Sequence, residues 1–404
     1  MSKENGLSKY RFVILLAIIP SIISTEMMWL SLAPISSIAE KHYGVSSLSI
    51  AMFSMSYMIM YILFSIPASW TVDKFGYRFS LIVGASITAI FGFARFFFAD
   101  NFTIVLIAQF IIAIGQPFLL NISTKVPANW FPLSERATAG GILTMAQYIG
   151  FAVPMLLAPM IAEKSGIKDM FLVFAIIASV SAVVAMIFTR EKPAIAPPGP
   201  SAPKEEISFQ SMFKLVKNKT FLLVLFICFI SIGIFNTLLT LLETILLPRG
   251  ITSAQAGVIG TVFVLAGIIG AVVLPLISDS IQKRMIFFVG NVALLIPLYL
   301  GFALISNYFA LNILAGAAGF LTMGVAPILF QHGTEVAYPL PEGTSLGVIL
   351  LMGQISGALF VYLFDVAQGL ANSVKFPMLC IVALTVLELP VALRMKESKL
   401  TKES

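Results

Sequence analysis

The sequence has few charged residues, and this scarcity is its strongest constraint. Asp, Glu, Lys and Arg make up only 11% of the 404 residues, whereas 59% are hydrophobic. The mean hydropathy is +0.99. A water-soluble protein of this length needs far more polar surface to cover its core. We therefore expect lipid to surround most of the chain.

The sequence also lacks the residue sets on which most enzymes and disulfide-stabilised proteins depend. Its two cysteines, Cys228 and Cys380, both lie in apolar runs. This predicts buried thiols and no disulfide framework. We recognise no zinc-ligand cluster, phosphate-binding loop, dinucleotide motif or nucleophile–base pair in the sequence. We therefore predict neither an enzyme nor an ATP-driven pump, and we expect no metal or other cofactor.

Long apolar stretches are what the sequence has in abundance. A stretch of about 20 apolar residues can span a bilayer as a helix. Twelve stretches of about that length or more lie at 12–36, 46–71, 79–99, 101–125, 137–162, 169–189, 219–247, 254–278, 285–305, 308–331, 345–370 and 376–394. A proline-rich polar segment, 190–218, separates the first six from the last six and reads as a linker. The predicted fold is an all-α integral membrane protein with two pseudosymmetric six-helix bundles, 1–189 and 219–404.

Basic residues are distributed unevenly between the two sides of these stretches. The net charge is +6, with 25 Lys and Arg residues. If both termini face the cytoplasm, nineteen of these fall on cytoplasmic segments, five fall on the opposite face, and Arg95 lies within the third stretch. The positive-inside rule predicts such a bias. We therefore expect cytoplasmic termini, a plasma (inner) membrane location and no nucleic-acid partner.

One segment of the first half reappears in the second half. Phe131-Pro-Leu-Ser-Glu-Arg-Ala-Thr-Ala-Gly140 returns 207 residues later as Tyr338-Pro-Leu-Pro-Glu-Gly-Thr-Ser-Leu-Gly347, and the same offset pairs Gln147 with Gln354. Transporters built from such repeats bind their substrate where the halves meet. We predict that the charged loop residues form salt bridges of a gate and do not merely belong to a solvated turn; these residues are Glu135, Arg136, Glu335 and Glu342. Gln147 could equally serve as substrate contact or as interhelical hydrogen bond.

The loop after the second stretch carries a recognisable motif. Ser69-Trp-Thr-Val-Asp73-Lys74-Phe75-Gly76-Tyr77-Arg78 resembles the signature loop of the major facilitator superfamily, G-x-x-x-D-R/K-x-G-R/K, with departures at Ser69 and Tyr77. This resemblance implies a cytoplasmic charge latch that stabilises the outward-open state. An ordinary tight turn at Gly76 is the alternative. A similar set follows about half a chain later, which favours a latch built from Asp73, Lys74, Arg78, Asp279 and Arg284.

A narrower resemblance rests on three further places. These are Gln116-Pro-Phe-Leu-Leu-Asn-Ile-Ser-Thr-Lys-Val-Pro-Ala-Asn-Trp130-Phe131, the Pro-Glu-Gly-Thr-Ser run ending at Ser345, and Trp29 in the first stretch. Together they are similar to solute carrier family 49, the feline-leukaemia-virus-subgroup-C-receptor-related transporters. Members of that family have been linked to choline, ethanolamine, haem and other small nutrients.

The family resemblance implies a site for an organic cation. In the family this site uses a Trp of the first helix, a Tyr of the seventh, and Gln residues of the fourth and eleventh. Trp29, Gln116 and Gln354 match that pattern, whereas Asn236 stands at the tyrosine position. Ammonium groups bind over aromatic faces with about 1–2 kcal/mol per desolvated ring. The missing ring therefore weakens the case for choline itself.

Glu26 is a candidate to compensate for that loss. It lies about 15 residues into the first stretch, or about 22 Å at 1.5 Å per residue, near the middle of a bilayer. A carboxylate at that depth normally faces a cavity that has a function. Trp29 shares its helix face, and alignment of Ser21 with Ser231 makes Asn236 the repeat mate of Glu26. A structural carboxyl, protonated and paired with a neighbouring helix, is the alternative.

The remaining intramembrane charges favour interhelical or interfacial pairs over substrate contact. Glu243, Asp365 and Glu388 belong to this group, and we expect Arg95 to pair with Asp100. His332 is expected in a cytoplasmic gate near Glu335. The methionine run Met52, Met55, Met58 and Met60 indicates packing and no metal site.

The leading hypothesis is a secondary active or facilitative transporter that works by rocker-switch alternating access. Its substrate would be a small organic cation or zwitterion, bound by Glu26, Trp29, Gln116, Asn236 and Gln354. A proton on Glu26 could be exchanged for that substrate. A larger amphipathic load, such as haem or a drug-like cation, and a nontransporting membrane receptor or sensor are the alternatives. Besides substrate, lipid and this coupling proton, no partner is required, and a monomer suffices.

Overall fold

The chain divides into two compact units, Met1–Lys204 and Glu205–Ser404. A computed structural model describes residues 9–193, 215, 217–281, 283–338 and 342–397, without the side chains at 124, 133, 134, 137, 342 and 343. Most of the predicted linker 190–218 therefore lies outside the described residues.

The predicted number of membrane helices is confirmed. Among the described residues, twelve helical spans are long and apolar enough to cross a membrane. Unit 1 contains α1 (Tyr10–Trp29), η2 (Ala33–Ile35), α2 (Ser36–Tyr43), α3 (Ser47–Phe75), α4 (Tyr77–Phe97), α5 (Phe102–Leu120), α6 (Ile122–Trp130), α7 (Leu133–Ser165) and α8 (Ile167–Phe188). Unit 2 contains α10 (Lys219–Leu246), η3 (Leu247–Arg249), α11 (Ser253–Ile281), α12 (Met285–Leu304), α13 (Tyr308–Ala337), α14 (Glu342–Ala371) and α15 (Lys375–Arg394).

Two of the predicted spans are longer than expected and are broken. The first extends to Tyr43 and the fourth to Trp130, beyond the predicted ends at 36 and 125. The first span breaks after Trp29, where the chain turns through Leu30–Leu32 into a short 3₁₀ helix that contains Pro34. Proline has no N–H to continue the hydrogen-bond ladder, which explains why the helix restarts there. Apolar content alone cannot locate such breaks.

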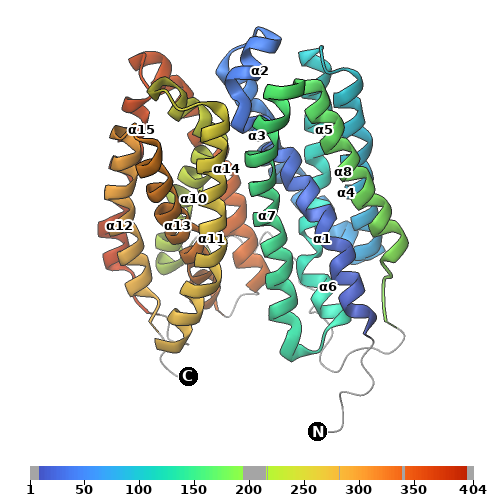
Figure 1. Cartoon of the computed structure of the whole chain (residues 1–404). Coiled ribbons are helices and arrows are strands. Elements are labelled where there is room, and N and C mark those ends of the chain that lie inside the picture. Colours follow the sequence, from blue (N-terminus) through green and yellow to red (C-terminus); the bar gives the residue numbers. More distant parts are fainter. Residues whose placement is uncertain (1–8, 194–214, 216, 282, 339–341, 398–404) are drawn as a thin grey trace. The chain divides into compact units, whose positions relative to one another are not determined.

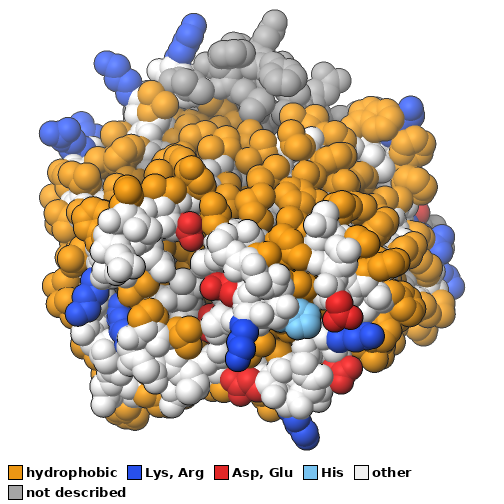
Figure 2. All heavy atoms as spheres, turned by 90° about the horizontal axis from the view of Figure 1, so that it is seen from above, with side chains coloured by type: hydrophobic (Ala, Val, Ile, Leu, Met, Phe, Trp, Pro, Cys, Tyr) orange, Lys and Arg blue, Asp and Glu red, His pale blue; other side chains and the backbone are white. Residues whose placement is uncertain are grey.

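Packing in each unit follows from the apolar faces of its helices. In unit 1, Ile18, Ile22, Leu81, Leu119 and Leu143 belong to one buried cluster drawn from α1, α4, α5 and α7. Figure 1 shows α1 running alongside α7. Figure 2 shows hydrophobic side chains over most of the visible surface, with the few charged ones set among other polar atoms. Apolar groups both inside and outside the units are what lipid as a solvent requires.

Candidate functional site

A buried carboxylate–amide pair lies at the centre of unit 1. Glu26 of α1 is only 1% exposed and Gln116 of α5 only 5%. The Gln116 Nε2 atom donates to both carboxylate oxygens of Glu26, at 3.1 Å each. The structure therefore brings together two residues that are 90 positions apart and that the sequence predicts in one site.

The position of Glu26 depends on a close approach between α1 and α7. A Cβ atom added at Gly150 of α7 would lie 2.5 Å from the Glu26 Cβ and 2.9 Å from the Ile23 carbonyl oxygen. Only glycine fits this contact without moving one of the two helices. Gly150 therefore sets how α1 presents its carboxylate.

A buried acceptor and aromatic rings lie beside this pair. The Gln116 Oε1 is buried and has no hydrogen-bond partner within the described part of the chain. The hydroxyl groups of Thr25 and Tyr57 interact with each other. Tyr57 and Tyr61 of α3 lie within electrostatic range of Glu26. A buried acceptor without a donor costs about 1–3 kcal/mol, so a bound ligand with N–H or O–H groups would relieve it.

Sequence reasoning missed Tyr57 and Tyr61. They lie four residues apart on one face of α3, among the methionines interpreted as packing. Two polar-tipped aromatic side chains in an otherwise apolar helix are the signal that could have found them. Tyr57 and Tyr61 have aromatic rings, whereas Asn236, at the position of the family's tyrosine, has none.

Trp29 makes a hydrogen bond and a ring contact within unit 1. Its Nε1 donates to the Ser54 carbonyl at 3.0 Å, and its ring meets that of Phe151 edge-on at 5.2 Å between centroids. The indole N–H is therefore occupied. The ring also lies one helical turn from Glu26, on the same side of α1.

The corresponding region of unit 2 contains Asn236 and Gln354. The buried Asn236 Nδ2 of α10 donates to the Gly353 carbonyl of α14 at 3.4 Å, next to the half-buried Gln354. Gln147 of α7, the repeat mate of Gln354, is half-buried as well. These three residues stay predicted substrate contacts, each within its own unit.

In the signature loop of unit 1, Asp73 and Arg78 do not pair with each other but contact other helices. The Lys125 Nζ of α6 lies 2.9 Å from the Asp73 Oδ1. Lys74 Nζ lies 4.5 Å from the Trp70 ring centroid. The Arg78 side chain donates to the Met186 carbonyl at 3.1 Å. Asp73 thus connects α3 to α6, while Arg78 connects α4 to α8.

An acidic residue that sequence reasoning did not single out closes this loop. The Glu191 Oε1 and Oε2 accept the Tyr77 and Arg78 backbone N–H groups, at 3.2 and 2.8 Å. They cap the start of α4, where helix N–H groups lack partners and the helix dipole favours an anion. The position of this glutamate, just after the last helix of the first repeat, is the sequence signal that could have indicated the cap.

Unit 2 repeats this arrangement. Glu397, which follows α15, accepts the backbone N–H groups of Arg284 and Met285 at 2.9 Å each and caps α12. The Arg284 side chain lies 2.6 Å from Glu335 of α13 and 4.0 Å from Asp279 of α11. The residues predicted to gate this unit are therefore brought together. Glu342, the other gating residue predicted here, has a side chain outside the described residues.

The repeated loop of unit 1 places its charges against other elements. The Arg11 NH2 of α1 donates to Glu135 of α7 at 3.1 Å. The Arg136 Nε donates to the Phe131 carbonyl at 3.2 Å, within the loop itself. Glu135 therefore fastens the start of α7 to the start of α1, as a gating salt bridge would.

The pH dependence of stability tests the Glu191 cap. Burial raises the pKa of Glu191, against the lowering effect of the two backbone N–H donors. A carboxyl with a raised folded-state pKa contributes stability that is present below the unfolded pKa and is lost as pH rises through the folded one. As the pH rises from below about 4.5, the ordinary pKa of a glutamate, the melting temperature of wild type should fall relative to that of Glu191→Gln.

Thermal unfolding in detergent across a pH series measures this difference. Glu163→Gln, at an exposed position near the end of α7, is the matched control and should show no such trend. A difference between wild type and Glu191→Gln that stays constant with pH, or a melting temperature of wild type that rises relative to that of the variant as the pH increases, contradicts this account of the cap.

The predicted pair between Arg95 and Asp100 is wrong. Arg95 is only 1% exposed and donates to Gln109 Oε1 at 2.7 Å and Ser31 Oγ at 2.8 Å. Gln109 in turn donates to the Met28 carbonyl at 3.1 Å. The guanidinium therefore lies near the carbonyl end of α1, where the helix dipole favours a cation. Asp100 lies 3.8 Å from His42 instead.

His332 does not pair with Glu335. Its ring is fully buried and meets Phe288 edge-on, and neither ring nitrogen has a hydrogen-bond partner within the described part of the chain. Glu335 bonds Arg284 and Gln331. Burial of the ring explains why proximity in sequence was misleading here.

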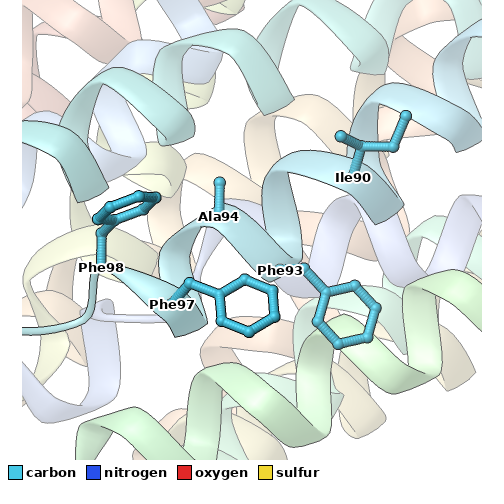
Figure 3. Close-up of a pocket in the computed structure, with 5 residues that line it drawn as sticks. All are labelled: Ile90, Phe93, Ala94, Phe97 and Phe98. Atoms are coloured by element: carbon cyan, nitrogen blue, oxygen red, sulfur yellow. The ribbon is translucent and has the colours of Figure 1, made fainter.

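An apolar depression on the surface of unit 1 is not a candidate site. It lies on one side of α4 and is lined by Ile90, Phe93, Ala94, Phe97 and Phe98 (Figure 3). All five side chains are apolar, so nothing there can orient a polar substrate. A surface of this kind suits contact with lipid chains.

Comparison with known proteins shows the family of the chain. The family model described as "Major Facilitator Superfamily" matches residues 14–361. Solute carrier family 49 member A3 of Danio rerio is 30% identical over 371 residues, covering 88% of this chain and 77% of that protein. The choline/ethanolamine transporter flvcr2b of the same species is 28% identical over 378 residues, covering 88% and 78%.

A further relative and a solved structure extend the comparison. The choline/ethanolamine transporter FLVCR1 of Felis catus is 28% identical over 393 residues, covering 91% of this chain and 68% of that protein. A bacterial homolog of the human lysosomal transporter Spinster, in an inward-facing and unoccupied conformation, superposes with a TM-score of 0.79. That match covers 96% of this chain and 97% of the other at 16% sequence identity, and so concerns the fold alone.

Proposed function

The chain belongs to the Major Facilitator Superfamily and is a relative of solute carrier family 49, and from this premise we propose that it carries a small organic cation or zwitterion. It is an integral multi-pass membrane transporter and not an enzyme. The proposed substrate class is that of choline and ethanolamine, the compounds named for two of its relatives.

The observation that carries this proposal is the Glu26–Gln116 pair. Glu26 is buried, and its described hydrogen-bond partner is a neutral amide. A lone buried carboxylate is costly, and binding a cation relieves that cost. Gln116 Oε1, a buried acceptor without a partner, would receive an N–H or O–H group of the same ligand.

Aromatic side chains of unit 1 complete the proposed recognition. Trp29 shares a face of α1 with Glu26, and Tyr57 and Tyr61 lie within electrostatic range of the carboxylate. Rings beside a cation add about 0.5–2 kcal/mol each. A primary ammonium such as that of ethanolamine fits the free acceptors better than a quaternary one, which has no N–H to donate. Asn236, Gln354 and Gln147 are proposed as further contacts.

We further propose that transport proceeds by alternating access with the termini in the cytoplasm of the plasma (inner) membrane. The ion pairs Asp73–Lys125 and Arg284–Glu335, with the caps Glu191 and Glu397, would open and close with the conformational cycle. A proton on Glu26 would be displaced when the substrate cation binds. A monomer is sufficient for this cycle.

Ligand-dependent thermal stabilisation of the purified protein tests the substrate class. Ethanolamine and choline should raise the melting temperature in a saturable way, while a neutral analogue, ethylene glycol, should not. Binding at a hundredfold excess over the dissociation constant corresponds to about 2.7 kcal/mol of stabilisation. Stabilisation by a porphyrin but by no small amine would instead support the larger amphipathic load. A response to none of these compounds would refute the proposed substrate class.

A further inference from the structure

Unit 2 contains a buried carboxyl, Glu388, that the proposed substrate site does not use. Glu388 of α15 is 1% exposed. The Ser231 hydroxyl of α10 donates to the Glu388 Oε1 at 2.8 Å. The contact joins the first and last membrane helices of this unit.

The repeat shows what unit 1 has in the same place. The offset of 207 residues that pairs the repeated loops also pairs Glu388 with Ser181, and it carries α8 (Ile167–Phe188) onto α15 (Lys375–Arg394) within one residue at each end. In the first helices of the two units, the alignment of Ser21 with Ser231 has an offset of 210 residues, three more than that of the loops. In unit 1, the Ser21 hydroxyl donates to the Ser181 carbonyl at 3.2 Å, and Ser24 and Ser181 share a hydrogen bond at 3.0 Å.

This comparison indicates that helix packing alone does not explain the carboxyl of Glu388. Both units join their first and last helices by serine-based hydrogen bonds at the same level. Unit 1 makes the contact with serine hydroxyl groups and a backbone carbonyl, so the helix crossing does not require a carboxyl. The extra feature of unit 2 is a group that can gain and lose a proton, placed where burial makes it expensive.

The surroundings of Glu388 contain no compensating cation. Among the described residues, no Lys, Arg or His nitrogen lies within 4.0 Å of its carboxyl. The titratable side chains in electrostatic range include Cys228 of α10 and Tyr299 of α12, and Tyr299 shares a hydrogen bond with Thr322 at 3.3 Å. On α14, which also packs against α15, Tyr362 and Asp365 lie nearer the opposite end of the helix pair.

We propose that Glu388 is a proton-binding site of unit 2, distinct from the substrate site around Glu26. When the α10–α15 contact is closed, the carboxyl holds a proton, because an ionised form would be buried without a cation. When the contact opens to water, the carboxyl releases one proton and becomes a carboxylate. Re-protonation precedes closure, so one proton is bound and released per opening, without any other reactant.

This site makes a prediction that a structural hydrogen bond does not. Glu388→Gln keeps the size of the side chain and an oxygen that accepts from Ser231, but it cannot release a proton. Glu388→Ser copies the residue of unit 1 and serves as the second variant. If the carboxyl only braces two helices, its infrared band should not respond to pH, and the effect of a pH gradient on uptake should be unchanged by Glu388→Gln.

The first measurement is the infrared absorbance of protonated carboxyl groups in the purified full-length protein during a pH titration. We expect a band that disappears reversibly as the buffer is made alkaline, that persists in Glu26→Gln and that is missing from both Glu388 variants. Identical titrations of wild type and Glu388→Gln overturn the proposal. So does a Glu388 band that does not respond to pH.

The second measurement is uptake of labelled ethanolamine into proteoliposomes with and without an imposed pH gradient. The inference rests on the proposed function here, but the two can fail separately. Glu388→Gln should keep the substrate-induced thermal stabilisation and lose the part of the gradient stimulation that depends on Glu388, so that the ratio of the two uptake rates falls below that of wild type. A ratio in Glu388→Gln equal to that of wild type overturns the proton site. Absence of any ethanolamine response in wild type refutes the substrate, while the infrared titration still decides the protonation of Glu388.

Discussion

Replacing Glu26 by glutamine is expected to weaken binding of ethanolamine by about tenfold to a hundredfold. The change removes a charge while it preserves size, so an ammonium loses a hydrogen bond to a carboxylate, which contributes about 1.5–3 kcal/mol. Each 1.4 kcal/mol corresponds to about a factor of ten in affinity. The Gln116 amide still has an oxygen to which it can donate at position 26, so the fold should persist.

Titration of the melting temperature with ethanolamine measures this loss of affinity. Glu163→Gln, which makes the same chemical change at an exposed position, should bind as wild type does. If Glu26→Gln binds ethanolamine with unchanged affinity, then Glu26 is a structural carboxyl, which is the alternative considered from the sequence.

Adding one methyl group at Gly150 should abolish most of the transport activity. The new Cβ of Gly150→Ala would lie 2.5 Å from the Glu26 Cβ, a distance that real Cβ atoms do not tolerate. The helices α1 and α7 must then separate or rotate, at a cost of about 1–3 kcal/mol. Because this contact sets the position of the carboxylate, uptake should fall by about tenfold or more.

Gly141 of the same helix provides the matched control. A Cβ added there meets no atom within 4 Å. Gly141→Ala should therefore transport normally, and its melting temperature should stay equal or rise, since alanine favours a helix by about 1 kcal/mol over glycine. Equal activity of the two alanine variants would show that the α1–α7 contact does not position the site.

The fold was accessible from the sequence because lipid imposes a simple rule on composition. Stretches without charge must be helical to satisfy their backbone groups, and their number follows from counting them. The breaks after Trp29 and at Asn121 were not accessible in this way, because counting apolar residues does not locate the end of a helix within a longer span.

The site was only partly predictable, for reasons that differ between residues. Glu26 was found because a carboxylate at that depth has few explanations, and Gln116 because it matched a family pattern. Tyr57 and Tyr61 were overlooked because a tyrosine in an apolar helix usually serves packing. Arg95 was assigned to Asp100 from sequence proximity, whereas the helix end at Met28 is its neighbour only in three dimensions.

The contacts of the loops were equally dependent on tertiary structure. Asp73 has Lys125 as its partner, 52 residues away, and Glu191 reaches the start of α4 across 113 and 114 residues. No spacing rule links such positions. The repeat does allow one contact of unit 2 to be inferred from unit 1, because Glu191 after α8 has its counterpart after α15 in Glu397.

Uptake of labelled ethanolamine into proteoliposomes tests the central claim most directly. Vesicles that contain wild type should accumulate the label in a saturable manner, with excess unlabelled choline competing. Vesicles with Glu26→Gln at the same protein density should fall toward the rate of protein-free vesicles. Equal uptake by wild type and Glu26→Gln, or uptake by wild type no faster than leakage into empty vesicles, would contradict a cation transporter that recognises its substrate through Glu26.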